Sequence, residues 1–139
     1  MKNYFKLSEF IVSDTAKKKG IDNTPNLEVE NHINELIINL LNPLREAWGS
    51  SIIVSSGYRC PELNKAVGGV NNSSHLTGYA VDLIPGNKKT KEFIKFCQEW
   101  IKNKQFDQCI SESNKHNKWC HIGYKSNNGQ QRRQIFKIG

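Results

Sequence analysis

Apolar positions recur at three- and four-residue steps in two long parts of the chain. Across residues 27–48 they form the buried stripe of an amphipathic helix. Pro25 suits the start of this helix and Gly49 its end. Pro43 lies inside the pattern, so we expect a bend or a separate last turn there. A second stripe of the same spacing predicts a helix over residues 90–101.

Shorter apolar segments have the composition or the alternation of β-strands. The expected strands are SIIVSS (51–56), GYAVDLI (78–84), FDQCISE (106–112), KWCHIGY (118–124) and a short closing IFKI (135–138). In GYAVDLI the alternation puts Ala80 and Asp82 on one face and Val81 and Leu83 on the other. Short helices or turns are expected within 5–20 and 62–66. This order predicts an α+β fold with helices on one side of a mainly antiparallel sheet.

Composition indicates one globular domain over residues 1–139, with 37% hydrophobic and 24% charged residues. No apolar run reaches bilayer length and the N-terminus lacks the core of a signal peptide. We therefore expect no membrane insertion, synthesis in the cytoplasm, and a monomer. The net charge of +7 suits a polyanionic partner, either nucleic acid or an anionic cell wall. No aromatic-basic motif accompanies the lysines, so no specific nucleic-acid partner is expected.

Two groups of side chains carry candidate chemistry. Four cysteines without C-x-x-C spacing predict buried, reduced thiols. His75 and Asp82 lie seven positions apart, and His121 lies in a later apolar segment. Imidazoles and one carboxylate are the usual ligands of a catalytic zinc ion. Spacing alone leaves open that the histidines are hydrogen-bonded core residues and that the aspartate binds backbone amides. His32 and His116 are expected to have ordinary polar surroundings.

The segment SSHLTGYAVDL resembles the S-x-H-x-x-G-x-A-x-D signature of zinc D-Ala-D-Ala carboxypeptidases and L-alanyl-D-glutamate endopeptidases. These peptidases act on peptidoglycan and share a fold with Hedgehog signalling domains. Further blocks resemble the same family in the same order. They are LSEF, GIDNTP, LLNPLREAWG, IIVSSGYRCPELNKAVGG, FDQCISE and WCHIGY. Together they cover nearly the whole chain, which makes the resemblance specific.

The resemblance implies zinc bound by His75, Asp82 and His121. It also implies that Arg59 holds the scissile carbonyl or a substrate carboxylate, roles that suit a rigid, permanently charged guanidinium. Ser73 matches the serine of the signature, and we expect it to hydrogen-bond substrate. Without the resemblance, Arg59 would be a surface ion-pair partner and Ser73 a loop-capping hydroxyl.

One position departs from the family pattern. Many members have a carboxylate three residues before the last histidine as the general base, where this chain has Lys118. The expected base is then Glu112, at the end of FDQCISE, with His116 as the alternative. Glu112 without this role would be an exposed strand-end charge.

The function implied is a zinc peptidase that cleaves an amide bond in peptidoglycan stem peptides. It would be a D-Ala-D-Ala carboxypeptidase or an L-Ala-D-Glu endopeptidase. One form of such an enzyme is a phage-type lysin, which acts at the cell wall once it is released. The resemblance does not choose between the two bonds. A different class also fits the sequence, namely a zinc-containing binding or structural module of the same fold without catalysis, as the lysine at position 118 allows.

Overall fold

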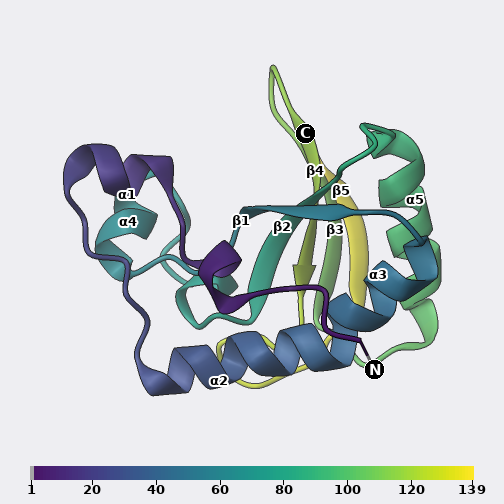
Figure 1. Ribbon diagram of the computed structural model, residues 1–139, viewed down its shortest axis with the longest axis horizontal. Coiled ribbons are helices and arrows are strands. Elements are labelled where there is room, and N and C mark those ends of the chain that lie inside the picture. The colour runs from purple at the N-terminus through teal and green to yellow at the C-terminus, as the bar shows by residue number, and fades with distance from the viewer. Residues whose placement is uncertain (1) are drawn as a thin grey trace.

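A five-stranded sheet forms the centre of the molecule in the computed structural model, which describes residues 2–139 (Figure 1). The strands are β1 (Ile52–Ser56), β2 (Ala80–Pro85), β3 (Gln108–Ser113), β4 (Lys118–Gly123) and β5 (Gln134–Ile138). Their order in the sheet is β1-β2-β4-β3-β5. All neighbours are antiparallel except β3 and β5, which are parallel. The predicted α+β class with a mainly antiparallel sheet is confirmed.

The helices fall into two groups. They are α1 (Asp14–Lys19), α2 (Leu27–Leu36), α3 (Asn42–Trp48), α4 (Pro61–Ala66) and α5 (Thr90–Trp100), with 3-10 turns at Leu7–Phe10, Ser74–Leu76 and Ile101–Asn103. α5 packs against β2, β3, β4 and α3, whereas α1 and α4 contact each other away from the sheet (Figure 1). Within the part of the chain that the structure describes, no helix is both long and apolar enough to cross a bilayer.

The predicted long helix continues through Pro43 instead of ending there. α2 and α3 are joined by one π-helical segment, Ile37–Leu41. Proline lacks an N–H and its ring clashes with the carbonyl four residues earlier, so a normal turn cannot form at that point. The wider turn avoids this clash, and the N–H of Asn42 donates to the carbonyl of Ile37, five residues back. The helix then ends at Gly49, whose φ of 77° suits a residue without a side chain.

The core fixes which face of β2 carries chemistry. Val81 and Leu83 are fully buried in one cluster with the apolar stripe of the long helix. Burial of each such side chain stabilises the fold by about 1.5–3 kcal/mol. Because successive side chains of a strand point to opposite faces, Asp82 must project from the face opposite the core. The helical stripe thus determines where the candidate ligand points.

The four cysteines are unpaired, in agreement with the prediction of reduced thiols. Cys97, Cys109 and Cys120, the three core thiols, are buried, and the sulfur atoms of Cys109 and Cys120 lie 3.7 Å apart. Burial raises the pKa of Cys97, and the contact with Cys120 together with burial raises that of Cys109. Cys60 differs, because it is only half-buried and its sulfur accepts the backbone N–H of Leu63 at the start of α4.

Candidate metal centre

His75, Asp82 and His121 lie together on the open face of the sheet. His75 is in the 3-10 turn Ser74–Leu76, Asp82 in β2 and His121 in β4, directly opposite Asp82 in the strand register. One oxygen of Asp82 lies 3.0 Å from Nδ1 of His121 and 3.4 Å from Nε2 of His75. One ligand atom from each residue lies within 4.8 Å of the others. The structure therefore brings together the three residues that the sequence singled out as ligands.

The second nitrogen of His75 shows that this donor set fits a cation. Nδ1 lies 2.8 Å from the carbonyl oxygen of Gly57, which can only accept a hydrogen bond, so Nδ1 carries the proton. In a neutral ring, Nε2 then presents a lone pair toward the carboxylate of Asp82. Two facing acceptors repel each other unless a cation or a proton lies between them. An imidazole fixed through its other nitrogen by a carbonyl is also the usual arrangement around a zinc ligand.

The loop that carries Gly57 is held close to the N-terminal segment. The N–H of Tyr58 donates to the carbonyl of Phe10 at 2.6 Å. A Cβ atom at Gly57 would lie 2.4 Å from that same carbonyl oxygen, so a side chain cannot fit there. Buried Asn23 adds hydrogen bonds to the carbonyl of Tyr58 and from the N–H of Cys60. These contacts fix the carbonyl that orients His75.

The electrostatics of the three residues keep the aspartate ionised. Burial raises the pKa of Asp82, but its electrostatic and hydrogen-bonding interactions with His75 and His121 outweigh this effect and hold the pKa well below its usual range. Burial likewise lowers the pKa of His121, but the hydrogen bond with Asp82 and its charge leave that pKa raised. The site therefore combines a stable anion with two imidazoles, a set that suits a divalent cation.

Arg59 lines the same cleft, of about 430 Å³, as the three candidate ligands. Its backbone N–H donates to the carbonyl of His75 at 3.1 Å. Its side-chain Nε is buried and has no hydrogen-bond partner among the described residues. Burial lowers the pKa of Arg59, and the carboxylates of Asp82 and Glu112 oppose that shift. The guanidinium thus has an unused donor beside the site, rather than the surface ion pair that an isolated arginine would form.

Glu112 lines this cleft as well, on the same face of the sheet as the candidate ligands. Trp119 lies opposite it in β4, and the indole N–H of Trp119 donates to Oε1 of Glu112 at 2.8 Å. The carboxylate is therefore held in place by its neighbour and is not a loose strand-end charge.

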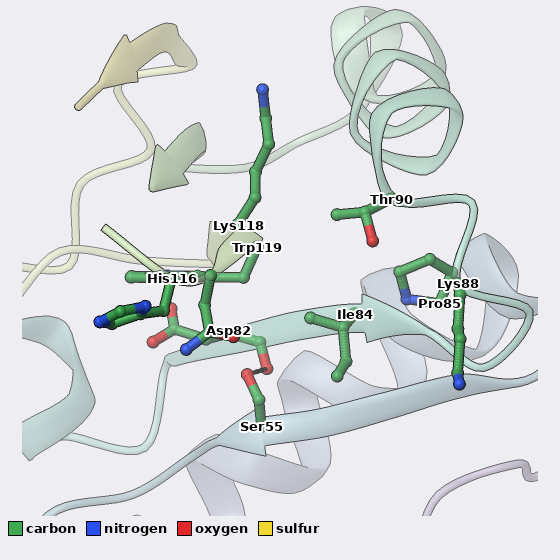
Figure 2. A pocket seen from close by; sticks show the side chains of 10 residues that line it. Ser55, Asp82, Ile84, Pro85, Lys88, Thr90, His116, Lys118 and Trp119 are labelled. Atoms are coloured by element: carbon green, nitrogen blue, oxygen red, sulfur yellow. Dashed lines mark hydrogen bonds between the residues drawn. The ribbon is translucent and has the colours of Figure 1, made fainter. Parts of the chain in front are cut away.

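The other candidates have different surroundings. Ser73 is buried beside the cleft, and its hydroxyl accepts the backbone N–H of His75 at 3.2 Å, which is a loop-capping role. His116 is exposed and lines a neighbouring cleft together with Lys118 (Figure 2). His32 stacks on Tyr79, with ring centroids 4.0 Å apart, and is not among the residues that line either cleft.

Sequence reasoning missed two groups that shape the site. The carbonyl of Gly57 has no side chain to mark it, although Gly57 lies within the block IIVSSGYRCPELNKAVGG. For Trp119, the strand KWCHIGY predicts a side chain on the same face as His121, but it does not predict the hydrogen bond to Glu112 or a place in the lining of both clefts. Only a short polar segment separates the strands FDQCISE and KWCHIGY, which favours an antiparallel pair, and this was the signal that could have joined Trp119 to Glu112.

The fold and site together define an α+β domain in which a His-Asp-His cluster that could hold a metal ion lies in an open cleft. A family model described as Peptidase M15 matches residues 3–123. The chain belongs to the Peptidase M15 family and is a peptidase, in line with the zinc carboxypeptidase family that the sequence resembles. No curated protein matches the chain.

Proposed function

We propose that this protein is a zinc-dependent peptidase that hydrolyses an amide bond in the peptide stems of peptidoglycan. The observation that carries the proposal is the cluster of His75, Asp82 and His121 in an open cleft of a Peptidase M15 chain. The bond would be D-Ala-D-Ala or L-Ala-D-Glu, as in the peptidases that SSHLTGYAVDL resembles. Action at the cell wall after release, as by a phage-type lysin, is part of this proposal.

The three clustered side chains would hold the zinc ion. When bound, zinc supplies a Lewis acid that polarises the scissile carbonyl and favours ionisation of water. The carbonyl of Gly57 keeps the proton of His75 on Nδ1, so Nε2 stays available as a ligand. Strand pairing places the remaining two ligands, Asp82 and His121, opposite each other across β2 and β4.

Glu112 would move the protons of the reaction. Trp119 occupies Oε1, and Oε2 has no hydrogen bond to the described part of the protein. Oε2 is thus free to take a proton from the attacking water and to pass it to the leaving amine. His116 is the weaker candidate, because it is exposed and lines the neighbouring cleft.

Arg59 would stabilise negative charge on the substrate. Its buried, unpartnered Nε lies beside the cluster, so a substrate carbonyl or carboxylate there would satisfy that donor. Ser73 has a hydroxyl hydrogen that its capping contact does not use, since its oxygen is the acceptor in that contact. It is therefore able to donate to substrate while it caps the loop.

Digestion of purified peptidoglycan, followed by mass spectrometry of the released fragments, tests the proposal. We expect the new termini to name one of the two bonds. Glu112→Gln keeps an acceptor for Trp119 but cannot take a proton, so the rate should fall by about 10²–10⁴-fold with zinc retained. The matched control is Glu62→Gln on the exposed side of α4, which should keep full activity.

Two results would count against parts of this proposal. Full activity in Glu112→Gln would remove Glu112 as the base and make His116→Ala the next variant to assay. No release by the wild-type protein, in spite of one bound zinc ion per chain, would favour the non-catalytic zinc module instead.

A further inference from the structure

A second cleft, of about 590 Å³, adjoins the candidate metal centre (Figure 2). Asp82 and Trp119 line both this cleft and the one that contains Glu112. The two clefts therefore adjoin at Asp82 and Trp119, next to the candidate metal centre. We refer to this cleft, lined by Ile84, Lys88, His116, Lys118 and their neighbours, as the β2–β4 cleft.

The charges around the β2–β4 cleft are positive. In Figure 2 the side chains of Lys118 and Lys88 lie on opposite sides of Ile84 and extend in opposite directions. The one acidic residue in its lining is Asp82, whose carboxylate already contacts two histidines. Neither lysine forms an ion pair with any residue that the structure describes. A carboxylate at either side of this cleft would thus lie near a lysine that no protein carboxylate neutralises.

The backbone of Lys88 has a strained conformation. Its φ is 65°, in the left-handed region where glycine is favoured, and its N–H closes a turn by donating to the carbonyl of Pro85 at 3.2 Å. Glycine would form this turn with less strain. The turn gains nothing from the ammonium group, so the lysine is better explained by what its charge does at the rim of the cleft.

We propose that the β2–β4 cleft is a second substrate subsite that binds a carboxylate-bearing part of the peptide, with Lys118 and Lys88 as residues that determine specificity. This inference rests on the proposed function, because stem peptides supply the carboxylates. One is on the D-glutamyl residue and another is at the C-terminal D-alanine. The proposal also gives a role to Lys118 at the position where the resembled family has an acid. Its positive charge would select substrate instead of moving a proton.

The test uses three synthetic stem pentapeptides, L-Ala-γ-D-Glu-L-Lys-D-Ala-D-Ala. One has both carboxylates free, one has the glutamyl carboxylate as an amide, and one has the C-terminal carboxylate as an amide. Binding is measured by calorimetry with the zinc-loaded Glu112→Gln protein, and KM and kcat with the active enzyme. Lys118→Gln and Lys88→Gln, each alone and together, are compared with Lys19→Gln, an exposed lysine of α1 that removes the same charge elsewhere.

We expect one amide to bind more weakly than the free peptide, which identifies the carboxylate concerned. At least one of the two single lysine variants should reduce that preference by roughly two- to fivefold, the effect of an exposed charge pair, mainly through KM. Lys19→Gln should leave it unchanged. Equal affinity for all three peptides would overturn the proposal, as would a preference that survives loss of both lysines, because Arg59 would then explain it. Carboxylate-dependent binding without hydrolysis would support the subsite while refuting the peptidase.

Discussion

Zinc should stabilise the folded protein by an amount that can be worked out in advance. The three ligands come together only in the native fold, since Asp82 and His121 are 39 residues apart and meet through strand pairing. Free zinc at 100 times its dissociation constant would then add about 2.7 kcal/mol to the free energy of unfolding. Unfolding entropy of about 2.1 cal/mol/K per residue gives about 0.29 kcal/mol/K for 139 residues, so the melting temperature should rise by about 9 °C.

Differential scanning calorimetry of the chelated and zinc-loaded protein measures this shift. His121→Ala should abolish it, whereas His116→Ala, which changes an exposed loop histidine, should keep it in full. An equal shift in the His121→Ala variant would refute the assignment, since the metal would then be bound elsewhere. Lower pH should weaken zinc binding, because protons compete for the ligands. The raised pKa of His121 means that this competition begins above the ordinary value of about 6.5.

Three further predictions concern the framework of the site. Gly57→Ala should lower the free energy of unfolding by about 1–3 kcal/mol, because the new Cβ atom would collide with the backbone of Phe10, and urea denaturation measures this loss. The same change should weaken zinc binding, because it shifts the carbonyl that orients His75, and zinc titration measures that effect. Asp107→Asn should cost about 1–3 kcal/mol in the same urea assay, since Asp107 is fully buried and accepts two side-chain hydrogen bonds from Arg132 at 2.8 Å. Iodoacetamide should label Cys60 in the native protein and leave the three core thiols unmodified, as peptide mass mapping would report.

The elements of this fold were predictable where a long pattern repeats. The stripe of the first helix and the alternation in β2 each involve several residues, so single exceptions such as Pro43 did not hide them. The pairing of strands within the sheet was harder to predict from the sequence. The parallel pairing of β5 with β3 depends on how the chain returns to the sheet after β4, which the side-chain pattern of IFKI does not encode.

The candidate site likewise contains residues that the sequence predicts and groups that it does not. His75, Asp82 and His121 were found because a family signature and a later block mark them, and the structure brings them together. The carbonyl that orients His75 was not found, because a backbone group leaves no signature in side-chain identity. The β2–β4 cleft was also missed, since Lys88 and Lys118 line one cleft only after two separate segments fold.

The pairing of β2 with β4 also has a kinetic consequence. Two of the three candidate ligands face each other across strands that are distant in sequence, and such non-local pairs close late when a chain folds. A metal ion bound by them would be absent from much of the folding transition state. We therefore expect zinc to leave the folding rate almost unchanged and to slow unfolding, so that its gain in stability appears as a longer lifetime of the native state.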